Sequence, residues 1–170
     1  MTPVATLASL ILLAQIMSIN AVLTKPDATF GKQCPAGTGI SRIISYYSSG
    51  HKDRAWAFFC RRDLKITNTC GWSGWLNWYE QELLFQCPTG VLTGVFSTHN
   101  NNYQDRRFRF RCCRTKRVCQ YDCRWTGYVN TFKGLKNYVV PYGYFITGAK
   151  SHHDNRHEDR VWRFLICRFH

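Results

Sequence analysis

The stretch DRAWAFFC, from Asp53 to Cys60, returns as DRRFRFRCC from Asp105 and as DRVWRFLIC from Asp159. The copies start 52 and 54 residues apart, so one short string occurs at a nearly constant period. A fixed period of this length is the sequence signature of a chain built from repeated structural units. The string is therefore the first guide to the fold.

A shift of the chain against itself by about 53 residues aligns more than the three strings. Cys34 falls on Cys87, and Cys70 falls on Cys123. The shared unit contains an aromatic pair with a nearby Asn, then Cys-Pro-x-Gly, an apolar segment, a polar loop and the Asp-Arg string. The three units cover about residues 30–62, 70–117 and 123–168.

The unit reads as a long β-hairpin. Its apolar segments, such as GVLTGVFSTH, are rich in β-branched and aromatic residues, and polar loops such as NNNYQ follow them. Residues 22–170 show no sustained helical period. We expect a single all-β domain over 22–170, made of three pseudo-repeats in a trefoil- or prism-like arrangement that closes the sheet edges.

Alternation along a strand divides the string between two faces. Arg106 and Phe108 share the inner face, whereas Arg107, Arg109 and Arg111 share the outer one. A buried arginine needs a carboxylate, carbonyl groups or an aromatic ring, and the repeat Asp residues are the nearest acids. We interpret the string as scaffold. This structural motif comprises Asp53, Arg54, Trp56, Asp105, Arg106, Phe108, Asp159, Arg160 and Trp162.

The combined motifs resemble the dermatopontin family. The resemblance rests on Cys-Pro-x-Gly, a downstream Ser-x-His or Ser-His, and Asp-Arg-x-Trp-x-Phe-x-Cys, and it covers about residues 33–168. It implies a secreted matrix or cell-adhesion protein, with agglutinins and cnidarian venom components among invertebrate relatives. The chain departs from the family in its strong basic charge, in a first unit without the aromatic lead-in, and in Val140, which replaces an expected cysteine.

The apolar run Val4–Val22 precedes the first charged side chain, Lys25, and predicts a secretory signal peptide over residues 1–21. A membrane anchor is the alternative. Nine cysteines follow, which in a secreted chain indicate a disulfide framework. Nine is an odd number, so at least one thiol is free or pairs between chains. In the second case the odd cysteine would link two chains into an oligomer.

The spacing allows Cys34–Cys60, and Cys87 with Cys112 or Cys113, as bridges within a unit. Each bridge closes a loop of about 26 residues and stabilises the fold by roughly 3 kcal/mol. Cys167 comes one residue late in its string, which predicts a β-bulge near Leu165 and Ile166. The other cysteines stay unassigned.

The chain has 23 Lys and Arg against 10 Asp and Glu, a net charge of +13. Eight cations lie within residues 106–124, and the outward ones suit sulfate and carboxylate groups. A solvated basic face is the alternative. The predicted partners are sulfated or sialylated glycans, cell surfaces or matrix proteins, with no physiological nucleic acid. The candidate glycan-binding residues are Arg107, Arg109, Arg111, Arg114, Lys116 and Arg117.

Two further groups of residues are candidate sites. His152, His153 and His157 could hold a metal ion, but a polar hairpin tip explains them equally well, and we predict no metal or cofactor. Trp72, Trp75, Trp78, Tyr79, Trp125 and Tyr128 could stack on sugars, with Asn77 and Asn130 as hydrogen-bonding groups, although packing in the core is the alternative.

No catalytic motif is present: G-x-S-x-G, H-E-x-x-H and a phosphate-binding glycine loop are all lacking, so we predict no enzyme. The sequence predicts a secreted extracellular-matrix or cell-surface adhesion protein that binds anionic glycans and could agglutinate cells. The alternatives are a membrane-active cytotoxin or defence protein, for which the membrane would be the partner, and a purely structural matrix protein.

Overall fold

The computed structural model describes residues 22–116 and 119–170. The predicted signal peptide and Arg117 lie outside the described residues. The described chain is all-β, which confirms the predicted fold class, and none of it forms a helix long and apolar enough to cross a membrane. Its strands are β1 (Phe30–Gln33), β2 (Thr38–Ser48), β3 (Asp53–Arg62), β4 (Ile66–Trp72), β5 (Leu83–Gln86), β6 (Val91–Asn100), β7 (Asp105–Thr115), β8 (Gln120–Trp125), β9 (Lys136–Val139), β10 (Phe145–Asp154) and β11 (Asp159–Phe169).

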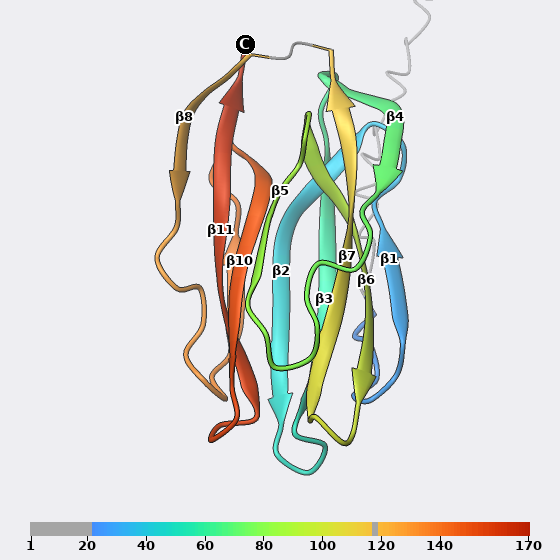
Figure 1. Cartoon of the computed structure of the whole chain (residues 1–170). Helices are drawn as coiled ribbons and strands as arrows, with labels where there is room; N and C mark the ends of the chain where they lie inside the picture. The colour runs from blue at the N-terminus through green and yellow to red at the C-terminus, as the bar shows by residue number, and fades with distance from the viewer. Residues whose placement is uncertain (1–21, 117–118) are drawn as a thin grey trace, which may run out of the picture.

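Three long antiparallel hairpins dominate the molecule: β2–β3, β6–β7 and β10–β11. They run lengthwise, and their turns gather at one end, the lower end in Figure 1. In each hairpin the repeat Asp is the first residue of the second strand. The residue before it has a positive φ: 47° at Lys52, 46° at Gln104 and 51° at Glu158. The string thus begins at the same point of the three hairpins.

Each hairpin gains an outer strand from a different unit. Strand β1 pairs with β6, β5 pairs with β10, and β9 pairs with β2. The last of these pairings returns from the third unit to the first, so the three units close into a ring rather than stack in a row. Strands β4 and β8 complete the two four-stranded sheets. The trefoil or prism description stays a prediction.

A β-bulge interrupts the first strand of every hairpin, at Ser41, Thr93 and Thr147. The sequence predicts a bulge near Leu165 and Ile166 of β11, but in the β10–β11 pair the extra residue lies on the opposite strand, β10. The pairing of β11 with β8 is irregular as well, between Ile166 and Arg168. The bulge carbonyls bind the neighbouring units. Those of Thr93, Thr147 and Ser41 accept the N–H groups of Cys34, Cys87 and Val140 at 2.7, 2.7 and 2.9 Å.

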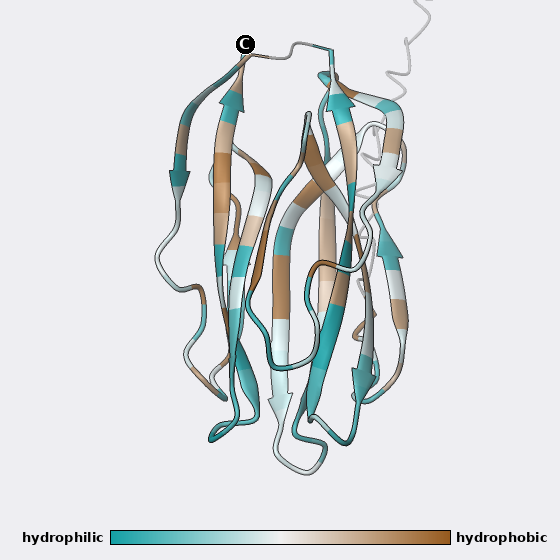
Figure 2. Cartoon of the chain, in the orientation of Figure 1, coloured by the Kyte–Doolittle hydropathy of each residue, from teal (hydrophilic) through white to brown (hydrophobic). Residues whose placement is uncertain are grey.

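The core centres on one aromatic side chain from each string. Trp56, Phe108 and Trp162 meet edge to face, with ring centroids 4.9 to 6.1 Å apart. This geometry is the one that aromatic rings prefer when they pack together. Apolar residues gather in the middle of the strands, whereas the ends near the turns are hydrophilic (Figure 2). The three units therefore share one core.

Eight of the nine cysteines form disulfides. The pairs are Cys34–Cys60, Cys70–Cys113, Cys87–Cys112 and Cys123–Cys167, and Cys119 is free and exposed. Cys167 therefore corresponds to Cys113 and not to a displaced copy of Cys112. The third unit has Val140 and Ile166 in place of the other bridge, and both side chains are buried.

Candidate functional site

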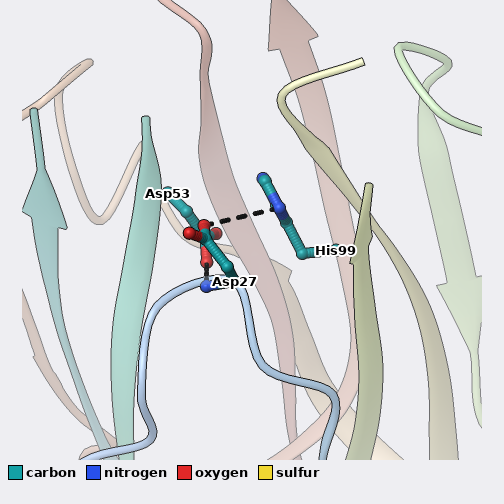
Figure 3. Close-up of side chains that lie close together, drawn as sticks. All are labelled: Asp27, Asp53 and His99. Atoms are coloured by element: carbon teal, nitrogen blue, oxygen red, sulfur yellow. Dashed lines mark hydrogen bonds and ion pairs between the residues drawn. The ribbon is translucent and has the colours of Figure 1, made fainter. Parts of the chain in front are cut away.

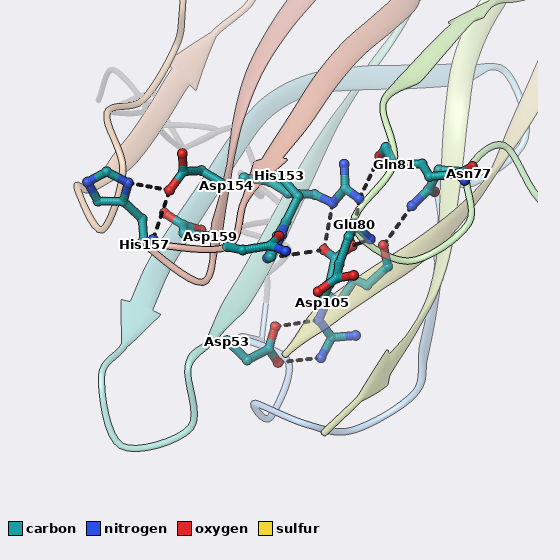
Figure 4. Close-up of polar contacts among 12 residues, drawn as sticks. Asp53, Asn77, Glu80, Gln81, Asp105, His153, Asp154, His157 and Asp159 are labelled. Atoms are coloured by element: carbon teal, nitrogen blue, oxygen red, sulfur yellow. Dashed lines mark hydrogen bonds and ion pairs between the residues drawn. The ribbon is translucent and has the colours of Figure 1, made fainter. Parts of the chain in front are cut away.

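The Asp-Arg strings form three buried ion pairs at the turn end of the molecule, and Figure 4 shows the pairs made by Asp53 and Asp105. In each pair the arginine Nε and Nη2 donate to the two carboxylate oxygens at 2.6 to 2.7 Å. Every pair joins two different units, and together they close a second ring. The pairs are Asp53–Arg106, Asp105–Arg160 and Asp159–Arg54.

Each carboxylate also accepts a backbone N–H from a residue with a positive φ. The donors are Asp27, Glu80 and Lys133, at 2.7 to 2.8 Å. Asp27 belongs to the first unit, for which the sequence showed no lead-in. The segment 24–27 has no aromatic residue, yet it makes the backbone contacts that the aromatic segments make in the other units.

Asn77 and Asn130 hold these lead-in segments to the hairpins. Asn77 Nδ2 donates to the carbonyl of Arg106 at 2.9 Å, and its Oδ1 accepts the N–H of Phe108 at 3.0 Å. Asn130 makes the matching bonds, and Thr24 accepts the N–H of Trp56 at 2.9 Å. Both Asn side chains are buried, so the hypothesis that they bind sugars is wrong.

The ring has no room for a substrate. The hollow that its side chains bound has a volume of about 20 Å³, which holds about one water molecule. The Asp and Arg residues of the ring are all buried. Because each buried arginine is paired with the aspartate of another unit, these groups hold the units together.

One carboxylate of the ring belongs to a small group that could hold a metal ion. Asp27, Asp53 and His99 each offer a ligand atom within 4.8 Å of the others (Figure 3). His99 Nδ1 lies 3.5 Å from Asp27 Oδ1, and His51 Nδ1 lies 2.7 Å from Asp27 Oδ2. A cation would have to compete with the guanidinium of Arg106 for Asp53. The group is a set of close polar contacts around Asp27, and we assign no metal to it.

The histidines of the third turn are directed to separate partners. His157 Nδ1 lies 2.7 Å from Asp154 Oδ1, and this hydrogen bond lowers the pKa of Asp154. His153 Nδ1 lies 3.0 Å from Asn155 Oδ1. His152 contacts the edges of two aromatic rings. The three histidines of this hairpin tip are therefore not brought together around one point.

The outer arginines of β7 lie against aromatic rings. The Arg107 guanidinium is 4.3 Å from the ring centre of Trp75 and 4.6 Å from that of Trp78. Arg109 is 5.8 Å from Trp75 and donates to the carbonyl of Ser73 at 2.9 Å. These side chains are half-buried, so the basic row and the aromatic segment form one surface.

Further cations follow along the chain. Arg111 is half-buried, and its Nη1 donates to Thr93 Oγ1 at 3.3 Å, whereas Arg114 and Lys116 are exposed. The three tryptophans of the segment are exposed as well, Trp72 by 41%, Trp75 by 42% and Trp78 by 54%, whereas Tyr79 is buried as the core alternative predicts. Packing in the core, the alternative for these tryptophans, is wrong. We call the surface formed by Trp72, Trp75 and Trp78 with Arg107, Arg109 and Arg111 the β7 face.

A family model described as Dermatopontin matches residues 24–170. The chain belongs to the dermatopontin family.

Three relatives carry different names. A Dermatopontin of Biomphalaria glabrata is 42% identical over 87% of this chain and 100% of its own length. A Hemagglutinin/amebocyte aggregation factor of Limulus polyphemus is 39% identical over 84% of both chains. Millepora cytotoxin-1 of Millepora dichotoma is 31% identical over 89% of this chain and 68% of its own. No solved structure matches the chain.

Proposed function

We propose that this protein is a secreted adhesion protein that binds anionic glycans of cell surfaces or matrix through the β7 face. The observation that carries the proposal is the contact of Arg107 with the exposed rings of Trp75 and Trp78. A guanidinium held on an aromatic ring stays charged and presents donors to sulfate or carboxylate groups. The net charge of +13 adds long-range attraction to polyanions.

The relatives support adhesion as the class of function. One of them is named for aggregation of amebocytes and another is a dermatopontin. Aggregation of cells needs at least two binding sites in one particle. The exposed free thiol of Cys119 is where a covalent dimer would join, and that oligomer stays a prediction.

Retention on heparin-agarose tests the proposal. A triple substitution of Arg107, Arg109 and Arg111 to Gln should elute at clearly lower salt than the wild type, because fewer cations then contact the polyanion. A control with Lys32, Lys52 and Arg156 changed to Gln removes the same charge from exposed positions elsewhere. If the control and the triple variant elute together, net charge alone explains retention and the β7 face is not the binding surface.

A membrane-active protein is the second candidate, because one relative is named a cytotoxin and the exposed tryptophans could enter a bilayer. Dye release from anionic liposomes separates the two functions. An adhesion protein should leave the vesicles intact at concentrations that saturate heparin. A purely structural matrix protein would show neither heparin retention nor leakage.

A further inference from the structure

The outer side of the third hairpin repeats contacts that build the β7 face. Arg163 Nε donates to the carbonyl of Thr126 at 2.8 Å, and its guanidinium lies 5.6 Å from the ring centre of Tyr128. Arg109 of the β7 face makes the matching pair of contacts, at 2.9 and 5.8 Å. In both units the lead-in segment therefore holds an arginine of the string over one of its own aromatic rings.

The aromatic side chains of this third unit are open to solvent. Tyr128 is exposed by 59% and Trp125 by 38%. Trp125 is paired with Leu165 across β8 and β11, and residues paired in this way lie on the same side of a sheet. Leu165 lies two residues after Arg163 along β11, so Trp125 and Arg163 share the outer side.

Lys150 is a second cation on this outer side. It is directly opposite Arg163 in the pairing of β10 with β11, and both side chains are half-buried. Like charges in such a pair repel each other. Neither cation forms an ion pair with another of the described residues. A sulfate or carboxylate group bound between them would offset the repulsion and accept hydrogen bonds from both.

The first unit lacks the residues of this surface. Ala57 occupies the position that Arg109 and Arg163 have in the other strings. Val22 occupies the position of the aromatic ring, two residues before Thr24. Neither side chain offers a charge or a ring face to an anionic sugar. Among the described residues, the surface therefore occurs on the second and third units and is absent from the first.

The two surfaces face in different directions. The inner sides of the strings meet in the common core, where Phe108 of β7 and Trp162 of β11 lie edge to face, with ring centroids 4.9 Å apart. Arg109 and Arg163 are the next residues along these strands, so they project away from the core. Ligands on the two surfaces would therefore lie on different sides of the molecule and can belong to different particles.

We propose that Trp125, Tyr128, Lys150 and Arg163 form a second binding surface for anionic glycans, which we call the β11 face. Together with the β7 face it makes a single chain bivalent, so that one molecule can join two cells without a dimer through Cys119. The inference rests on the proposed function and deepens it, since it names the second of the two sites that aggregation requires.

The number of short ligands bound per chain tests the second surface. The probe is a heparin tetrasaccharide, titrated into the full mature chain with Cys119→Ser and followed by calorimetry and native mass spectrometry. We expect about two tetrasaccharides per chain, one for each surface. A double substitution of Lys150 and Arg163 to Gln should bind half as many, and so should the triple variant of the β7 face.

Aggregation of heparin-coated beads measures bridging itself. The Cys119→Ser protein should sediment as a monomer and aggregate the beads. The Lys150 and Arg163 double variant should still bind to beads, but should need at least about tenfold more protein to aggregate them, because one of the two sites is lost. A control with Lys32 and Lys52 changed to Gln removes the same charge from exposed positions and should aggregate beads as the parent does.

Equal thermal unfolding of the double variant and the control excludes a general loss of structure. Tyr128→Ala, a change at an exposed ring, is an independent second variant and should weaken the same site. One tetrasaccharide per Cys119→Ser chain, or equal aggregation by the double variant and the control, would overturn the β11 face while heparin retention still supports the proposed function. Absence of heparin retention in the wild type would overturn the proposed function itself.

Discussion

At the scale of single residues, Lys136 departs most from the repeat. It occupies the position where the other units have Phe30 and Leu83, and its side chain is wholly buried. Its Nζ lies 4.2 Å from the ring centre of Trp56 and 4.6 Å from that of Trp162, and no hydrogen-bond partner is present among the described residues. Burial, and then the charge of Arg54, lower the pKa of Lys136 well below its ordinary value of 10.5.

Replacement of Lys136 by Met should stabilise the fold, because an amine without a partner is removed from the core while the volume is kept. We expect the free energy of unfolding to rise by about 1–3 kcal/mol, measured by urea denaturation at pH 7. Lys32→Met, at an exposed position, should change it by less than about 0.5 kcal/mol. A destabilised Lys136→Met would mean that the amine has a favourable partner in the core.

The same residue predicts a pH dependence. Between the lowered pKa of folded Lys136 and the ordinary value near 10.5, the unfolded chain binds a proton that the folded chain does not. Stability from this group therefore rises with pH across that window, and is lost as the pH falls through it. The advantage of Lys136→Met over the wild type should shrink from pH 7 to pH 10. Burial also raises the pKa values of Tyr47 and Tyr138, but their contributions to the pH dependence are the same in both proteins and cancel in the comparison. An advantage that is independent of pH would contradict the assignment.

At the scale of elements, the three hairpins are closed by different means. Cys34–Cys60 and Cys87–Cys112 close the first two, over sequence separations of 26 and 25 residues. The third has two buried aliphatic side chains, Val140 and Ile166, at the equivalent positions. The apolar pair keeps the packing but leaves the unfolded chain less constrained than a bridge would.

A double substitution of Val140 and Ile166 to Cys should form the missing disulfide. The bridge would stabilise the oxidised protein by roughly 3 kcal/mol relative to its reduced form, as expected for a loop of this length. The measurements are thiol counting and thermal unfolding with and without reductant. The Val140→Cys single variant controls for the lost packing. Three free thiols under oxidising conditions, those of Cys119 and of both introduced cysteines, would show that the hairpins are not equivalent at this point.

At the scale of the whole molecule, two rings hold the units together. The backbone ring pairs each hairpin with a strand from another unit, and the ion-pair ring joins the Asp of one string to the Arg of another. Since the pairs are buried, each partner depends on the other for its charge to be compensated. A change at one pair should therefore affect the assembly of all three units.

Asp105→Asn should destabilise the protein by about 3–5 kcal/mol, because it leaves the guanidinium of Arg160 buried without its carboxylate. Glu82→Gln makes the same change of charge at an exposed position and should have an effect below about 0.5 kcal/mol. Denaturant unfolding of both variants at pH 7 measures the difference. Similar stabilities of the two variants would mean that the ring contributes little to the fold.

The candidate site could be predicted only in part. Alternation along DRRFRFR placed Arg107 and Arg109 on the outer face of the strand. It could not show that their guanidinium groups lie on Trp75, because that contact joins segments more than thirty residues apart. The role of Thr24 was also missed, although its position 53 residues before Asn77 was a usable signal. Thr in place of Asn hid the equivalence.

The sequence by itself determined the all-β class, the hairpins and the inner face of each string, because these follow from a period of two and from a repeated spacing along the chain. Only the tertiary structure decided which Asp binds which Arg, since the partners lie on different units and are separated by 53, 55 and 105 residues. It also decided which aromatic rings face the solvent. Local periodicity sorts side chains between the faces of one strand, but the closure of three units into a ring decides what covers each face.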